Sequence, residues 1–380
     1  MNVVIAIDSL KGSLSSLQAG EAVREGVLRA CPDAAVCVRP LADGGEGTVE
    51  TLTLGMGGRL RTVTVTGPLG APVEARYGIS ADGKAAVMEM SAAAGLTLIP
   101  PGRRDPMQAT TFGVGEMIRD AVGQGCRRFI VGIGGSATND GGAGMLQALG
   151  FGMFDGAGNP IARGARGLEA LRRITADGAL PELRECTFRV ACDVNNPLCG
   201  KTGASAVFGP QKGATPAMIA KADAWLAQYA LLAQSVNPGA DPERPGSGAA
   251  GGLGFAFLAF LNAELESGVR IVLEETKLAD DVRKADIVVT GEGRLDAQTV
   301  MGKAPSGVAR IAKQFGKPVV AFAGSAAEDA AICNSHGIDA FFPILRSVVT
   351  LEEAMAPYTA YRNLSDTAEQ VFRLLRIGSF

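Results

Sequence analysis

Short apolar runs alternate with amphipathic helical segments at both ends of the chain. Residues 2–7 form an apolar run that predicts a strand, and residues 13–30 repeat apolar side chains at the spacing of one helix face. Ser15 and Gln18 form the pattern of a capping box at the start of that helix. The same alternation returns towards the C-terminus, where a strand at 286–290 is followed by a helical segment. A strand, a helix and another strand in succession are typical of a parallel sheet.

The middle of the chain has a different pattern. Three β-rich runs follow one another at residues 61–66, 73–79 and 85–90, with only short Gly- and Pro-containing turns between them. Such close spacing favours antiparallel pairing of neighbouring strands. Further strands are expected at 128–133 and 188–194, and helices at 111–122, 141–149, 217–235 and 254–266.

We therefore predict an α/β protein of two domains. Residues 1–60 and 280–380 are expected to form one discontinuous domain, a Rossmann-like doubly wound parallel sheet. Residues 61–279 are expected to form a second, inserted α/β domain that contains a mixed sheet. The length of 380 residues agrees with two domains. The cleft between two such domains is the usual place for a ligand.

Composition and charge argue against several classes of protein. Charged residues make up 20% of the chain and the net charge is −3, so no basic field predicts binding to nucleic acid or to a membrane surface. The apolar runs are far shorter than the roughly 18 residues of a membrane-spanning helix. Seven cysteines without a C-x-x-C pair indicate reduced thiols in a cytoplasmic protein. The single histidine, His336, is expected at the surface, so catalysis by histidine is not expected.

The candidate chemistry rests on charged residues that follow predicted strands. Glu292, Arg294, Asp296 and Lys303 come after the strand at 286–290. Two carboxylates there can hold Mg²⁺ or accept a proton, and the two cations can bind anionic oxygens. In open α/β sheets, ligands collect at the carboxyl ends of the strands.

Two earlier strand ends carry similar residues. Ser9 and Lys11 lie in the turn after the first strand, just before a helix N-terminus, where backbone N–H groups and the helix dipole favour an anion. Asp43 and Glu46 flank a Gly-Gly pair after the second strand. Because these strands are predicted to share one parallel sheet, the residues that follow them add to one candidate site.

A glycine-rich turn follows the strand predicted at 128–133. Gly132, Gly134 and Ala137 match the G-x-G-x-x-G/A fingerprint of dinucleotide-binding folds. The turn is unusually polar, however, and a nest of its N–H groups suits a chain of phosphates equally well. The residues expected to line this anion site are Gly134, Gly135, Ser136, Thr138 and Asn139.

Asp193 stands at the end of the strand predicted at 188–194, and Asn195 follows it. A carboxylate and an amide there resemble a site for a metal ion or a hydroxyl group. Gly200, Lys201 and Thr202 look like the end of a P-loop, but Asn195 replaces the first glycine of that motif. We therefore do not expect a P-loop.

Six segments stand out in order along the chain: residues 8–13, 40–48, 132–144, 191–200, 207–214 and 290–305. Together they resemble the glycerate kinase family, specifically the bacterial type-I glycerate 2-kinases. The resemblance covers essentially the whole chain, with Leu10 as a departure where most relatives are expected to have Phe. It implies ATP-dependent phosphorylation of D-glycerate, dependence on Mg²⁺ and a two-domain α/β fold.

The resemblance agrees with what phosphoryl transfer needs, namely positioning and neutralisation of charge. Asp193 or Asp296 is expected to act as the general base towards the glycerate hydroxyl. Glu292 is expected to hold Mg²⁺ together with Asp43 or one of those aspartates. Arg294 is expected to bind the glycerate carboxylate, an anion that suits its guanidinium.

The remaining candidates are expected to contact the two substrates. Ser9 and Asn195 are assigned to glycerate, and the glycine-rich turn is assigned to the phosphates of ATP. Three lysines are expected to neutralise phosphate oxygens: Lys11, Lys212 and Lys303. Lys11 is expected to lie close to the reacting phosphoryl group.

Alternatives remain open at this point. The 2-hydroxyl of glycerate is the expected acceptor and the 3-hydroxyl is the runner-up. The dinucleotide fingerprint supports a rival function, an NAD(P)-dependent hydroxy-acid dehydrogenase, and a small-molecule binding protein without turnover is a third. The density of acids and lysines at strand ends favours catalysis. The expected partners are D-glycerate and ATP, and assembly into a homo-oligomer stays open.

Overall fold

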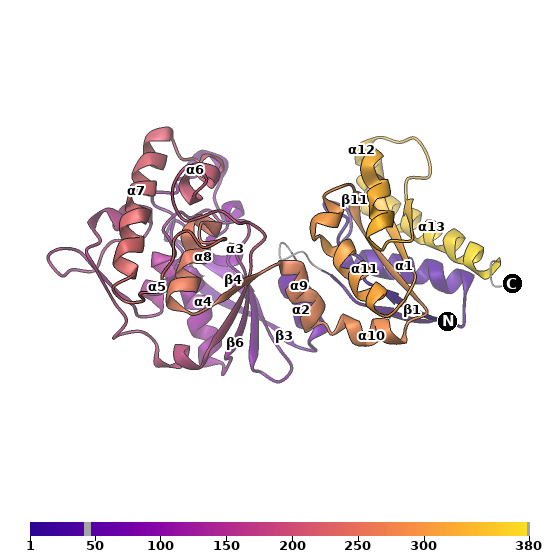
Figure 1. Cartoon of the computed structure of the whole chain (residues 1–380), viewed down its shortest axis with the longest axis horizontal. Coiled ribbons are helices and arrows are strands. Elements are labelled where there is room, and N and C mark those ends of the chain that lie inside the picture. The colour runs from indigo at the N-terminus through magenta and orange to yellow at the C-terminus, as the bar shows by residue number, and fades with distance from the viewer. Residues whose placement is uncertain (42–46, 378–380) are drawn as a thin grey trace. The chain divides into compact units, whose positions relative to one another are not determined.

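The computed structural model describes residues 1–41 and 47–377 of the chain (Figure 1). The fold consists of two compact units. The first comprises residues 1–56 and 269–380, and the second comprises residues 57–268. In chain order the second unit is therefore inserted within the first.

Five strands form the sheet of the first unit: β1 (Asn2–Ile5), β2 (Ala35–Val38), β11 (Ile287–Leu295), β12 (Val319–Ala326) and β13 (Ala340–Pro343). They are parallel and lie in the order β2-β1-β11-β12-β13, which confirms the predicted doubly wound parallel sheet. The order reverses between β1 and β11. That reversal is the topological switch point, outside which ligands bind in open α/β sheets.

The helices of this unit are α1 (Ser16–Ala30), α2 (Thr48–Gly55), α9 (Gly268–Glu275), α10 (Leu278–Lys284), α11 (Ala304–Gln314), α12 (Leu351–Met355) and α13 (Pro357–Ile377). The 3₁₀ segments η6 (Thr299–Met301) and η7 (Glu328–His336) lie before and after α11. The connections through α1 and α11 run in opposite directions across the sheet, so right-handed crossovers place these helices on opposite faces. Ser15 and Gln18 form the predicted capping box of α1.

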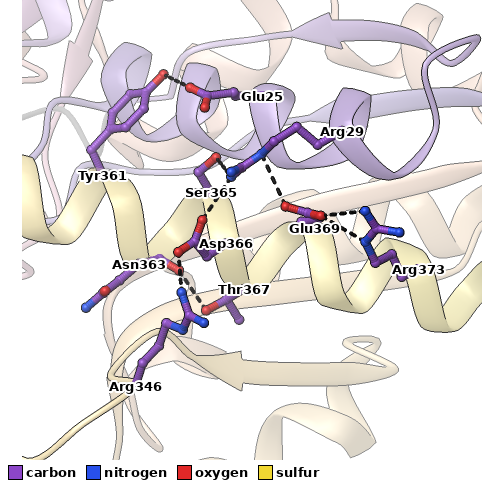
Figure 2. A network of polar contacts seen from close by, with 10 residues as sticks. All are labelled: Glu25, Arg29, Arg346, Tyr361, Asn363, Ser365, Asp366, Thr367, Glu369 and Arg373. Atoms are coloured by element: carbon purple, nitrogen blue, oxygen red, sulfur yellow. Dashed lines mark hydrogen bonds and ion pairs between the residues drawn. The ribbon is translucent and has the colours of Figure 1, made fainter.

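α1 and α13 lie side by side although most of the chain separates them (Figure 2). The contact is closest at Gly26, where a Cβ atom would lie 2.1 Å from the carbonyl oxygen of Ser365. Beside it, the Arg29 guanidinium lies 3.1 Å from a carboxylate oxygen of Asp366 and 3.3 Å from one of Glu369. Gly26 therefore allows the two helices to approach, and Arg29 links their polar edges.

The main sheet of the second unit contains β3 (Arg59–Thr66), β4 (Pro72–Ile79), β5 (Ala85–Glu89), β6 (Arg128–Gly132), β9 (Thr187–Ala191) and β10 (Glu264–Glu266), in the order β10-β9-β6-β5-β4-β3. β3, β4 and β5 pair antiparallel, as predicted, and the remaining pairs are parallel. The predicted mixed sheet is thus confirmed. The carboxyl ends of β5, β6, β9 and β10 consequently meet at one edge.

The helices of the second unit are α3 (Ser91–Ala94), α4 (Phe112–Gly123), α5 (Ala143–Ala148), α6 (Ala204–Phe208), α7 (Pro216–Ala233) and α8 (Ala249–Phe260), and β7 (Gly152–Phe154) pairs with β8 (Arg173–Thr175) as a separate ribbon. Phe188 stacks on Phe129 with ring centroids 4.8 Å apart, and Phe257 of α8 packs on its other side. Across the described ranges, no helix is both long and apolar enough to cross a bilayer.

Some predicted elements were wrong in extent, and the strand predicted at 188–194, for example, already ends at Ala191. Residues 254–266 do not form one helix, because Asn262 has a φ of 48° and the residues after it pair with β9 as β10. The strand predicted at 286–290 continues to Leu295, so Glu292 and Arg294 lie within β11 and not in the turn after it. Its register with β12 pairs Glu292 with Ala323.

Replacing Gly26 by valine should destabilise the first unit. The new side chain would need space that the Ser365 carbonyl oxygen and Ala368 Cβ fill, 2.1 and 2.9 Å from the added Cβ. Overpacking of this kind costs about 1–3 kcal/mol, which calorimetry would record as a lower unfolding temperature. Arg24→Ala on the exposed side of the same helix is the control and should change stability by less than about 0.5 kcal/mol. An unfolding temperature equal to that of the control would contradict the close contact.

Candidate active site

The switch point of the first unit brings two acidic residues to neighbouring strands. Asp8 follows β1 and is 7% exposed, and Glu292 lies within β11 and is 8% exposed. The Asp8 N–H donates to the carbonyl oxygen of Gly291 over 2.9 Å, so the two segments stay paired beyond the end of β1. Asp8 was not among the site residues predicted from the sequence, although its place at a strand end is a signal that could have found it.

β11 reaches this position because Gly291 allows an unusually close neighbour. A Cβ on Gly291 would lie 1.9 Å from the carbonyl oxygen of Phe322 in β12, so only glycine fits there. Strand side chains two apart share one face, which places Thr290, Glu292 and Arg294 in a row. The Thr290 hydroxyl is buried and has no hydrogen-bond partner within the described parts of the chain. Arg294 is exposed at the far end of the row.

Glu292 belongs to a compact group of charged and polar side chains. Thr299 donates its hydroxyl to Glu292 Oε1 over 2.5 Å and accepts the N–H of Asp296 over 3.2 Å. Lys303 places its ammonium 3.7 Å from Glu292 Oε2 and 3.6 Å from Asp296 Oδ1. Thr299 was also missed from the sequence, because nothing in a threonine seven residues away signals this contact.

The environment of Glu292 disfavours its ionised form. Burial raises the pKa of Glu292, and the nearby carboxylates of Asp8 and Asp296 raise it further. The hydrogen bond from Thr299 and the charge of Lys303 oppose these effects without cancelling them. A further cation beside these carboxylates would favour their ionised forms.

The donor set fits Mg²⁺. This ion prefers carboxylate oxygens, and proteins usually hold it through one or two carboxylates while phosphates of the substrate and water complete its shell. Asp8 and Glu292 supply two carboxylates at the switch point, and one oxygen of Glu292 is already oriented by Thr299. Asp43 and Glu46 lie outside the described residues, and no cluster of three potential metal ligands occurs within the described ones.

The turn after β1 lies against the same strand. The backbone of Lys11 approaches Gly293 closely, since a Cβ on that glycine would lie 3.7 Å from the Lys11 nitrogen. The Lys11 side chain is exposed, and the Ser9 N–H donates to Asp8 Oδ1 over 2.7 Å. The first unit therefore gathers six of the predicted site residues at one sheet edge: Ser9, Lys11, Glu292, Arg294, Asp296 and Lys303.

In the second unit, the glycine-rich turn after β6 is held from inside by Lys212. This lysine is 2% exposed, and its ammonium donates to Ser136 Oγ over 2.8 Å and to the Thr138 carbonyl oxygen over 2.7 Å. Burial lowers its pKa to about 7, and the neighbouring carboxylate of Asp140 opposes that effect. Asp140 is itself buried and accepts N–H bonds from Thr111 and from two glycines after the turn.

Most of the turn is therefore inaccessible to a ligand. Ser136, Thr138 and Asn139 are buried, and only the backbone of Gly134 and Gly135 is exposed. α5 begins only at Ala143, so the turn does not open directly into a helix as the dinucleotide fingerprint requires. The exposed glycine pair is the part of the turn that remains available to an anion.

Asp193 and Asn195 follow β9 and are both exposed. β9 pairs parallel with β6, so they lie at the same sheet edge as the glycine-rich turn. The Gly268 N–H donates to Asp193 Oδ1 over 3.3 Å. β5 ends at this edge too, with Glu89 and then Ser91, whose Cβ lies 3.5 Å from where a Cβ on Gly135 would be. Neither this glutamate nor this serine was predicted from the sequence.

Comparisons with known proteins agree along the whole chain. The model of the glycerate kinase family matches residues 3–376. The glycerate kinase of Haemophilus influenzae is 48% identical over 375 residues, which cover 99% of each chain. The glycerate 2-kinase of Escherichia coli is 47% identical over 378 residues, covering 100% of this chain and 99% of the relative.

A solved structure agrees with these sequences. A crystal structure of a Salmonella typhimurium LT2 protein assigned as glycerate kinase 2 superposes with a TM-score of 0.91 at 48% identity, covering 100% of this chain and 99% of that one. Similarity of this extent concerns both units of the fold. The chain therefore belongs to the glycerate kinase family and is a kinase.

Proposed function

We propose that this protein transfers the γ-phosphoryl group of ATP to the 2-hydroxyl of D-glycerate. Membership of the family supports the reaction class, and the Escherichia coli relative named glycerate 2-kinase supports the choice of hydroxyl. The observation that carries the proposal is the acidic group around Glu292, with Lys303 beside it. Phosphoryl transfer needs a place where a metal and cations neutralise phosphate charge, and this group has that chemistry.

Mg²⁺ would be held by Glu292 with Asp8 or Asp43, and it would neutralise charge on the phosphates. Lys303 pairs with Glu292 and Asp296 and would turn its ammonium to phosphate oxygens when ATP binds. Lys11 would add a second cation at the same sheet edge.

Arg294 would bind the carboxylate of glycerate, because its exposed guanidinium offers paired donors at the end of the row from Thr290. Ser9 and Asn195 remain candidates for the glycerate hydroxyls. The exposed backbone of Gly134 and Gly135 would bind phosphate oxygens, and Lys212 would act by holding that turn in shape.

The general base is one of two aspartates. Asp296 lies beside Lys303, with its carboxylate fixed by the N–H of Gln298 over 2.9 Å. Asp193 is exposed at a strand end of the second unit. Either carboxylate would take the proton of the attacking hydroxyl.

Phosphorus NMR of the reaction product tests the proposed function directly. With ATP, Mg²⁺ and D-glycerate, the product should be 2-phosphoglycerate, with one ADP formed per molecule. Formation of 3-phosphoglycerate would contradict the choice of hydroxyl. Reduction of NAD(P)⁺ by hydroxy acids, without ADP formation, would contradict the kinase itself.

Neutralising the general base should remove turnover without unfolding the protein. Either Asp296→Asn or Asp193→Asn is expected to lower kcat by about 10²–10⁴-fold, the usual contribution of general acid–base catalysis. Steady-state kinetics and circular dichroism measure the two effects. Asp33→Asn, at an exposed position of the first unit, is the control and should keep full activity. Wild-type kcat in both test variants would reject the base assignment.

Glu292→Gln should make the metal-free protein more stable at neutral pH. Because folding raises the pKa of Glu292, the fold favours the protonated acid, and stability is lost as the pH rises above the ordinary value of 4.5. The variant removes that loss, so in EDTA its unfolding temperature should exceed the wild-type value at pH 7.

The difference should shrink as the pH falls towards 4.5 and vanish below it, where the acid becomes protonated in both states. Glu328→Gln, at an exposed site in η7, is the matched control and should show no such pH-dependent gain. A less stable Glu292→Gln variant at pH 7 would contradict the raised pKa of Glu292 in the folded protein.

A further inference from the structure

The first unit contains a pocket that shares no residue with the candidate active site. Its volume is about 550 Å³, within the range of roughly 300–1,000 Å³ typical of small-molecule sites. One wall is a stripe along α11, and the others come from η6 and the end of η7. The lining residues are Val300, Ser306, Arg310, Lys313, Gln314, Ser335, His336 and Gly337.

Gly337 shapes the wall opposite α11. It ends η7 with a φ of +97°, a conformation that favours glycine. A Cβ there would lie 3.1 Å from Cγ of Lys313, so a larger residue would press on the lysine stem. The two walls therefore approach closely at this point, and the pocket is built from both.

The pocket is lined by cationic groups in a protein whose net charge is negative. Arg310 is exposed and has no hydrogen bond or ion pair to any part of the chain that the structure describes. Lys313 is partly neutralised by Asp339, whose Oδ2 lies 2.5 Å from its ammonium. No lining residue is acidic. The uncompensated charge of Arg310 favours an anion.

His336 adds a donor on the opposite wall. Its Nδ1 lies 2.9 Å from the carbonyl oxygen of Ile332, and a carbonyl only accepts, so Nδ1 carries the proton. This leaves Nε2 as the ring nitrogen open to a ligand. A ring protonated on both nitrogens would donate to an anion from Nε2.

We propose that this pocket is a second ligand site, which binds a small anion through a phosphate or carboxylate group. Arg310 would bind two of its oxygens, a geometry that suits the planar guanidinium. His336 would complete the set through Nε2 of the doubly protonated ring. The Ser306 and Ser335 hydroxyls already donate to backbone carbonyl oxygens, so they are not donors to the anion.

The site adjoins the segments that hold the acidic group. Val300 directly follows Thr299, which donates to Glu292. Ser306 donates its hydroxyl to the carbonyl oxygen of Lys303 over 2.9 Å, and Lys303 pairs with Glu292. An anion that orders η6 and the start of α11 would therefore affect Thr299 and Lys303, the two residues that contact the Glu292 carboxylate. By linkage, ligands bound there would change the affinity for the anion by the same factor.

The single histidine makes a direct test possible. In the full chain without a histidine tag, the imidazole Hε1 proton gives one NMR signal, and it arises from His336 in this pocket. Inorganic phosphate is added at constant ionic strength, with chloride as the exchanged anion. We expect a saturable shift of the signal. Malonate is titrated separately, and the anion that saturates at lower concentration identifies the preferred group.

Arg310→Gln should weaken the response about tenfold or more, since it removes charge-assisted hydrogen bonds to the anion. Arg24→Gln, an exposed arginine on α1, should keep the wild-type affinity. A shift that never saturates, or that is equal in Arg310→Gln, would overturn the proposal. Because the signal does not depend on turnover, either result leaves the proposed kinase reaction to its own test.

Discussion

The arrangement depends on negative charge that is buried at the switch point of a parallel sheet. Glu292 lies inside β11, and its carboxylate stays largely out of solvent beside Asp8 and Asp296. Burying a carboxylate is unfavourable unless a cation lies nearby. Burial also strengthens the attraction between the cation and the carboxylate, because the interior has a low dielectric constant. Lys303 and Thr299 hold the Glu292 carboxylate in place.

The second unit differs from the first, because a buried lysine supports its candidate anion site. A buried lysine, Lys212, fixes the glycine-rich turn from inside through its two hydrogen bonds, and the neighbouring Asp140 accepts backbone N–H groups. What reaches the surface is the backbone of Gly134 and Gly135. A nest of N–H groups binds anionic oxygens without any side chain of its own. The polar side chains of the turn thus act as its support.

Much of the fold could be predicted from periodicity, since apolar runs and helical repeats directly report which faces are buried. Glu292 and Asp296, singled out because they follow a predicted strand, do lie beside Lys303, although Glu292 is within the longer β11. The extension of β11 could not be predicted, because it depends on a contact between Gly291 and a distant strand. Burial of Lys212 could not be predicted either, because its hydrogen-bond partners lie more than seventy residues away in the sequence.

The carboxylates at the switch point are proposed to bind the metal of the phosphoryl donor. Crystals grown with Mn²⁺ and a non-hydrolysable ATP analogue would show by anomalous diffraction where that metal lies. We expect a manganese peak within coordination distance of the Glu292 carboxylate, with phosphate oxygens in its shell. A nucleotide bound with its metal elsewhere, and no peak beside Glu292, would rule out this metal site.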